Sequence, residues 1–597
     1  MFSVVKKLFA LLTKSQRKRF YSLQILVILM AILEIFSVAS IIPFMSLVGD
    51  SSQLHGDSVM AIIYSACDLS FSQFMFLLGV AVLGVLMISS LFSMFTIWKL
   101  SMFATQVGTE ITDRLYLYYL NQGWLFHTSK SSAQLIKNIA GEAGRVSKGI
   151  VMPLIQMNAR IVLAIFISIG IFIYEMMVAI IGLFVFSLAY LILYKLVRTY
   201  LIRNGRVVSD MNGLRFGLMN EAFGGIKDIL LLGRANYFVN RFKNTSDTLA
   251  FSQGTNTALT QVPVYLMQLI AFGSMISLIL YLIFSHSGKL GLILPILSVY
   301  GLATFKLIPA FQHIYSSIGA IKSNIPALES IQKDLEYSSN IILENDINNF
   351  KYFKLNKYIS LENISFGYES SEKLILNQIN LTISANSIVG IVGPTGSGKS
   401  TLINIILGLI EPSEGRLMVD QQRINNKNLR SWQNSIGYVP QYIFLSEGTI
   451  AENVAFGLPK EEINFDKVFN ALKLANMINY VTSLEHGIET KVGERGIKLS
   501  GGQQQRIGIA RALYSEAEIL IFDEATSSLD GNTEKIIIDS ILEFSGKKTI
   551  IMVAHRLKTV ERCEQLFLID NGILVDQGTY HELIDRSQIF KKMAEHT

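Results

Sequence analysis

The chain has 597 residues, of which 50% are hydrophobic and only 16% are charged, whereas a soluble globular protein carries about 25% charged residues. This composition, with a mean hydropathy of +0.40, excludes a disordered or fibrous chain and predicts a membrane protein. The formal net charge of +6 is small and scattered, so we expect no nucleic acid partner and attribute the charge to basic cytoplasmic loops.

Six long, almost uncharged runs precede residue 315. Each approaches or exceeds the roughly 20 residues that a helix needs to cross a bilayer, and buried helices of soluble cores seldom remain so apolar beyond about 14 residues. We therefore expect a short cytoplasmic segment, 1–19, followed by a transmembrane domain, 20–315. The predicted spans are 20–48, 74–98, 150–173, 176–197, 259–285 and 290–312.

Lysine and arginine orient these spans because they are retained on the cytoplasmic side. The connection 49–73 contains neither residue, whereas 99–149 contains six and 195–258 contains nine. Both termini are therefore expected in the cytoplasm of a multi-pass protein of the inner (cytoplasmic) cell membrane. The two basic connections are predicted to be helical extensions of the spans into the cytoplasm.

The pattern of residue types changes near residue 351, where short runs rich in β-branched residues begin to alternate with helical stretches. This pattern is typical of an α/β domain with a mainly parallel sheet. Residues 316–350 are predicted to form a helix end and a polar linker. The expected fold is thus an all-α six-helix membrane domain followed by an α/β P-loop nucleotide-binding domain, 351–597.

A phosphate-binding loop lies between an apolar strand, 388–392, and a helix that begins near Thr401. Its glycines allow backbone N–H groups to wrap around phosphates at the helix N-terminus. Lys399 is expected to reach the outer phosphates, and the hydroxyl of Ser400 is placed for Mg²⁺. The predicted ATP-binding residues here are Gly393, Pro394, Thr395, Gly396, Ser397, Gly398, Lys399, Ser400 and Thr401.

Two further motifs extend this site. A buried strand ends in Asp523 and Glu524, which we assign to Mg²⁺ binding and to the general base that activates water. Such a pair alone is more often a helix cap, but the phosphate loop favours the catalytic interpretation. Paired glycines precede a helix in the segment Ser500, Gly501, Gly502 and Gln503, which is either a second anion site or a flexible turn.

With this set of motifs the chain resembles the ATP-binding cassette (ABC) transporters, in particular type I exporters whose membrane domain precedes the ATPase. The resemblance covers essentially the whole chain and implies that Ser500–Gln503 closes over ATP bound to the opposite subunit of a homodimer. It also implies short coupling helices within 124–134 and 225–238. Four further roles follow from it: Tyr368 stacks on adenine, Gln441 senses Mg²⁺ and water, Asp530 links the two ATP sites, and His555 contacts the terminal phosphate.

The transported substrate is less well defined. Glu34, Arg160 and Lys306 lie within or at the ends of spans, and such residues are costly enough in a membrane to suggest a cavity suited to phosphate or pyrophosphate. The alternative is that they reach the membrane interface. An amphipathic outer segment, 58–68, could lie on the membrane surface or pack against the spans.

These features, with segments 40–44 and 305–309, resemble the bacterial flippase of lipid-linked oligosaccharides, although Lys306 stands where an arginine would fit that flippase better. The resemblance implies a membrane lipid environment and an amphipathic, lipid-linked substrate. Two alternatives remain: an exporter of another lipid, drug or peptide, and a membrane-anchored ATPase that gates or signals without transporting anything.

Overall fold

The computed structural model describes residue 9 and residues 12–49, 59–67, 69–174, 176–285, 290–338, 353–368, 373–525, 531–554 and 556–595. The chain forms two compact units, one of residues 1–122 and 126–342 and the other of residues 123–125 and 343–597. Each unit is considered by itself.

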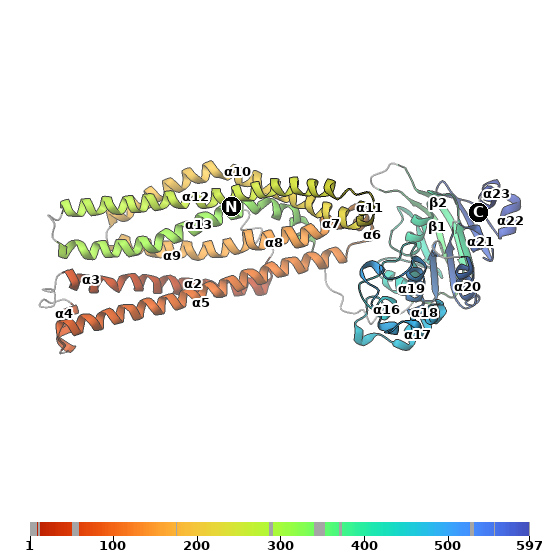
Figure 1. The fold of residues 1–597 in the computed structure, drawn as a ribbon, viewed down its shortest axis with the longest axis horizontal. Coiled ribbons are helices and arrows are strands. Elements are labelled where there is room, and N and C mark those ends of the chain that lie inside the picture. The colour runs from red at the N-terminus through yellow and green to blue at the C-terminus, as the bar shows by residue number, and fades with distance from the viewer. Residues whose placement is uncertain are drawn as a thin grey trace. The chain divides into compact units, whose positions relative to one another are not determined.

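The described part of residues 1–342 is helical, and its longest helices run side by side (Figure 1). The helices are α2 (Lys14–Ala39), α3 (Ile41–Gly49), α4 (Val59–Cys67), α5 (Phe71–Leu120), α6 (Trp124–Ser129), α7 (Ser132–Ile136), α8 (Ala143–Val146), α9 (Met152–Tyr174), α10 (Met176–Gly224), α11 (Ile226–Leu231), α12 (Ala235–Ser285) and α13 (Leu290–Ser338). Two π-helical segments, η2 (Lys137–Glu142) and η3 (Ser147–Val151), flank α8.

A helix occupies each of the six predicted spans. Among the described residues, four stretches are long and apolar enough to cross a membrane: Lys14–Val48, Phe71–Leu120, Ser132–Ile173 and Ala235–Ser277. The other two predicted spans lie in α10 and α13. Since α5 has 50 residues, it is about 75 Å long, against about 30 Å for the hydrocarbon core of a bilayer. The long helices therefore extend well beyond a membrane, as the basic connections predicted.

The predicted linker at 316–350 requires correction, because α13 continues to Ser338 and includes Pro326. An interior proline costs a helix roughly 3 kcal/mol. The helix nevertheless presents a fully buried apolar stripe that includes Ile321, Ile331 and Leu335 and packs against α5 and the segments before α9. The free energy gained by burying this stripe outweighs the cost of the interior proline. The prediction from composition did not take this burial into account.

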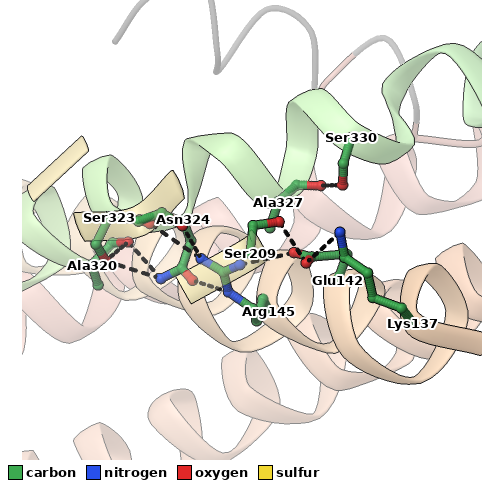
Figure 2. A network of polar contacts seen from close by, with 10 residues as sticks. Lys137, Glu142, Arg145, Ser209, Ala320, Ser323, Asn324, Ala327 and Ser330 are labelled. Carbon is green, nitrogen blue, oxygen red and sulfur yellow. Dashed lines mark hydrogen bonds and ion pairs between the residues drawn. The ribbon is translucent and has the colours of Figure 1, made fainter. Parts of the chain in front are cut away.

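A buried carboxylate organises the segment that joins α7 to α9 (Figure 2). Glu142 is 0% exposed. Its Oε1 lies 3.6 Å from the Nζ of Lys137, and its Oε2 lies 2.9 Å from the Nη1 of Arg145. The hydroxyl of Ser209, on α10, donates to Oε1 at 2.6 Å. Glu142 is thus fully paired, as a buried charge must be.

Arg145 connects the Glu142 network to α10 and α13. Its Nε donates to the Oδ1 of Asn324 on α13 at 3.1 Å, and its Nη2 donates to the carbonyl of Gly205 on α10 at 3.2 Å. A Cβ on Gly205 would lie 2.0 Å from the carbonyl oxygen of Ser323, so only glycine permits this helix approach. The network therefore ties the segment before α9 to α10 and α13.

The second unit contains two sheets, and its mainly parallel sheet confirms the predicted α/β class. The six-stranded sheet has the order β10-β9-β3-β8-β7-β6, in which only β10 is antiparallel, and an antiparallel sheet has the order β2-β1-β4-β5. The strands are β1 (Tyr358–Phe366), β2 (Leu376–Ser384), β3 (Ile388–Val392), β4 (Glu414–Val419), β5 (Gln422–Arg423), β6 (Ile436–Val439), β7 (Ile519–Asp523), β8 (Thr549–Val553), β9 (Gln565–Asp570) and β10 (Ile573–Gly578).

Side chains alternate between two apolar cores along the parallel strands. In β7, Leu520 and Phe522 join one core, whereas Ile519 and Ile521 join the other. A parallel sheet buried on both faces requires this continuous apolar pattern. The helices of the unit are α14 (Lys399–Ile406), α15 (Leu429–Asn434), α16 (Ile450–Val454), α17 (Phe465–Leu474), α18 (Ile478–Ser483), α19 (Gly501–Tyr514), α20 (Gly531–Leu542), α21 (Leu557–Val560), α22 (Tyr580–Arg586) and α23 (Gln588–Glu595), with three short 3₁₀ turns.

Candidate active site

Strand order brings the predicted catalytic segments to one edge of the six-stranded sheet. β3, β8, β7 and β6 are consecutive neighbours and run parallel. Their carboxyl ends therefore lie together, which is where open α/β sheets bind ligands. The phosphate loop follows β3, Gln441 follows β6, and the acidic pair lies at the end of β7.

The phosphate loop has the backbone that its glycines permit. Gly396 and Gly398 have φ values of 81° and 103°, in the left-handed region that other residues rarely adopt. Gly398 is the N-cap of α14, so the loop leads directly into a helix N-terminus that favours anions. Thr395, Gly396 and Ser400 are exposed. The geometry of this segment matches a phosphate cradle.

Lys399 lies inside this loop. Its side chain is almost fully buried, and Nζ donates to the carbonyl oxygens of Gly393 at 2.7 Å and Pro394 at 2.8 Å. Burial lowers the pKa of Lys399, while the negative charges of Glu524 and Asp523 oppose that shift. The ammonium group is therefore held within electrostatic reach of both acids, where the outer phosphates of a nucleotide would lie.

Glu524 is held by its backbone and by a side-chain partner. Its φ is 49°, which is uncommon for a residue with a side chain and marks strain of a kind found at active sites. Its N–H donates to the carbonyl of Val553 at 3.0 Å, fixing the turn after β7. The Nε2 of Gln441 donates to its Oε2 at 2.7 Å. Two residues predicted separately to act on water and Mg²⁺ thus touch one another.

Tyr438 was not predicted from the sequence. Its hydroxyl donates to the Oδ2 of Asp523 at 3.3 Å. Burial raises the pKa of Tyr438, and the negative charge of Asp523 raises it further. Its place in β6, three residues before Gln441, could have indicated it, because β6 and β7 are neighbours. We infer that Tyr438 orients the carboxylate assigned to Mg²⁺.

Replacing Tyr438 by Phe keeps the ring and removes only this hydrogen bond. Because one hydrogen bond contributes about 0.5–1.5 kcal/mol, the Mg²⁺ concentration for half-maximal ATP hydrolysis should rise roughly 2- to 10-fold. A Mg²⁺ titration of ATP turnover tests this expectation. Tyr514→Phe, which removes the hydroxyl that accepts the N–H of Asn464, is the matched control and should leave the Mg²⁺ titration unchanged. Equal shifts in both variants would contradict the assignment.

Of the remaining predicted residues, some are described by the structure and two are not. The half-buried ring of Tyr368 packs edge-on against Phe366, with centroids 5.1 Å apart. Ser500 is the N-cap of α19: its hydroxyl accepts from the N–H of Gln503 at 3.3 Å, and the Oε1 of Gln503 accepts from the N–H of Ser500 at 2.8 Å. Asp530 and His555 lie outside the described residues.

The described residues fit Mg²⁺ that is bound together with ATP. Ser400, Asp523 and Gln441 would supply oxygen ligands, which Mg²⁺ prefers, and Mg²⁺ usually takes one or two carboxylates plus substrate phosphates. In the part of the chain that the structure describes, no group of three His, Cys, Asp or Glu gathers to hold a metal without such help. When bound, the ion would neutralise charge on the phosphates.

Comparison with known proteins extends these observations. Residues 376–527 match the family model described as ABC transporter. The ATP-dependent lipid A-core flippase of Cupriavidus pinatubonensis is 30% identical over 377 residues, and the heterocyst differentiation ATP-binding protein HepA of Nostoc sp. is 31% identical over 386 residues. These matches cover 62% and 64% of this chain and 62% of each relative.

The whole fold also has a solved counterpart. A bacterial Atm1-family ABC exporter, solved with ATP bound, superimposes with a TM-score of 0.79 at 21% sequence identity, covering 97% of this chain and 98% of that one. The predicted fold class is therefore confirmed in both halves. Residues 376–527 therefore match the ABC transporter family model, and the chain as a whole has the fold of an ABC exporter.

Proposed function

We propose that two copies of this chain form an ATP-driven exporter that moves an anionic, lipid-linked substrate across the cytoplasmic membrane. Our specific candidate is a polyprenyl-pyrophosphate oligosaccharide. The observation that carries the substrate class is a group of charged side chains inside the helical unit. The Nζ of Lys306, on α13, lies 2.5 Å from the Oε2 of Glu34 on α2. Arg160, on α9, lies close enough to interact electrostatically with Glu34.

This cluster favours an anionic ligand. The side chain of Glu34 is 8% exposed and that of Lys306 is 26% exposed, so the pair lies within the helical unit and neither charge extends freely to an interface. Ionisable groups at membrane depth are costly and mark substrate pathways. Two cations face one carboxylate, which leaves one positive charge in excess per chain. In a dimer that excess doubles, which suits a pyrophosphate.

The outer helix supports a lipid substrate. In α4, Ile62 is 64% exposed and Ile63 is 43% exposed, whereas Ala61 is buried. Met60 and Tyr64 pack against the cluster of Leu47 and Phe74. One side of the helix thus packs on the spans, and the exposed isoleucines could contact lipid. The name of the relative in Cupriavidus also points to a lipid substrate.

ATP drives the cycle by favouring one of two states. If Ser500–Gln503 of one copy closes over ATP bound to the other copy, nucleotide binds only the closed dimer and shifts the population toward it. The short helix α11 falls where a coupling helix was expected, and Leu230 and Leu231 are 70% and 81% exposed. Such an apolar tip would suit docking on an ATPase domain. Hydrolysis then resets the dimer.

The substrate class is tested by measuring ATP turnover in lipid nanodiscs with a panel of lipids. We expect stimulation by undecaprenyl pyrophosphate that carries an oligosaccharide, and loss of most of it in Lys306→Glu, because two carboxylates would then face the anion. Lys306→Arg keeps the charge and should retain the response. Stimulation by a drug or a peptide alone would favour another exporter. No response to any member would favour the membrane-anchored ATPase.

A further inference from the structure

We infer that Glu34 is an internal counter-anion, which holds Lys306 until the substrate's phosphate displaces it. This inference rests on the proposed function and adds a residue that sets affinity and selectivity. It starts from the location of a carboxylate in the first predicted span, a residue of the helical unit. Among the described residues, Glu34 is one of the few charged groups that are buried.

Both carboxylate oxygens of Glu34 are engaged. Oε2 pairs with Lys306 at 2.5 Å, and Oε1 accepts a hydrogen bond from the hydroxyl of Ser93, on α5, at 2.9 Å. Three helices, α2, α5 and α13, therefore meet at this carboxylate. The pair provides the charge compensation that a buried ion needs, without any ligand.

The surroundings are richer in cations than this pair requires. Arg160, on α9, interacts electrostatically with Glu34, in addition to Lys306 on α13, which forms the ion pair with the same carboxylate. The carboxylate is thus shared between two helices that each carry a cation. A substrate phosphate offers several oxygens to the same cations and competes directly with Glu34 for Lys306.

Competition of this kind predicts opposite effects on affinity and on turnover. Without the internal anion, Lys306 is available at once, so an anionic substrate binds more tightly. Release of the substrate is also slower, because no carboxylate at residue 34 competes with the substrate for Lys306. A residue that only supports packing would weaken binding or lower both quantities together. The split between the two therefore distinguishes the roles.

The test compares Glu34→Gln with wild type in nanodiscs of phosphatidylcholine and phosphatidylglycerol, using undecaprenyl pyrophosphate as the probe and undecaprenol as its uncharged partner. Gln keeps the length of the side chain and can still accept from Ser93. We expect the concentration of undecaprenyl pyrophosphate for half-maximal ATPase stimulation to fall about 5- to 10-fold. The maximal stimulated rate should fall as well, and the response to undecaprenol should not change.

Control variants make this result specific. Glu110→Gln alters a carboxylate that pairs with Gln16, outside the cluster, and should leave the half-maximal concentration as in wild type. Adding Lys306→Gln to Glu34→Gln should abolish the gain in affinity. If Glu34→Gln unfolds at a lower temperature than Glu110→Gln, Glu34→Asp replaces it, and the shorter arm should give a smaller gain in the same direction.

Two outcomes would overturn the inference, and they differ from failure of the proposed function. If wild type responds to undecaprenyl pyrophosphate but Glu34→Gln binds it no more tightly, Glu34 is not a competing anion. An equal gain for undecaprenol, which carries no phosphate, would show that the gain does not come from competition between two anions for Lys306. If wild type itself shows no response to the pyrophosphate, the proposed substrate class is wrong, and the inference falls with it.

Discussion

We expect Glu524→Gln to bind ATP about as well as wild type and to hydrolyse it roughly 10²- to 10⁴-fold more slowly, the usual contribution of a general base. The amide is the same size as the carboxylate but cannot take a proton from water. The turn that carries residue 524 is fixed by its hydrogen bond to the Val553 carbonyl, which the substitution leaves in place. The loss is therefore chemical.

Two measurements on the same preparation check this prediction. Binding of a fluorescent ATP analogue should give a Kd near that of wild type, and phosphate release should fall to the background of the assay. Glu516→Gln is a matched control, because this exposed carboxylate pairs only with Lys467 among the ion pairs of the described residues. Hydrolysis by Glu524→Gln at a third or more of the wild-type rate would exclude Glu524 as the base.

We expect Glu142→Ala to destabilise the helical unit by about 3–5 kcal/mol, because removal of one partner leaves a buried charge uncompensated. Figure 2 shows the contacts of Glu142 with Arg145 and Lys137, and both cations would lose this carboxylate. Ser209→Ala removes one hydrogen bond to that carboxylate and should cost only about 1–3 kcal/mol. Thermal unfolding in detergent should rank the variants in this order.

One result would contradict the expected ranking of unfolding temperatures. If Glu142→Ala unfolds at the wild-type temperature, the network adds nothing to stability. Arg114→Lys, which alters a cation of α5 that bonds to Leu335 and Ser338 of α13, tests whether any change between these helices has the same effect. We expect a smaller loss there, since a positive charge remains.

The phosphate loop was predictable because its conformation is encoded locally. Glycine at 396 and 398 permits positive φ, and the neighbouring strand and helix follow from short apolar runs. The acidic pair was predictable for the same reason. The contact between Gln441 and Glu524 was not, because it depends on β6 and β7 being neighbours.

The long helices show where reasoning from sequence fails. Pro326 and the polar residues around it indicated a helix end, but packing of a buried stripe continues α13 to Ser338. Glu34 and Lys306 were identified as separate ionisable residues, and their pairing across 272 positions depends on helix register. Glu142 was not identified from the sequence, because its contacts with Lys137, Arg145 and Ser209 depend on how the helical segments pack.

The most direct test of the proposed function is flipping in proteoliposomes. Purified protein is reconstituted with a fluorescent polyprenyl-pyrophosphate oligosaccharide, and the labelled glycan exposed on each side is measured after addition of ATP and Mg²⁺. We predict that the labelled glycan crosses the membrane only with ATP, and that Glu524→Gln abolishes its movement. Movement at the same rate in that variant, or none in a wild-type protein that hydrolyses ATP in response to the lipid, would contradict the proposal.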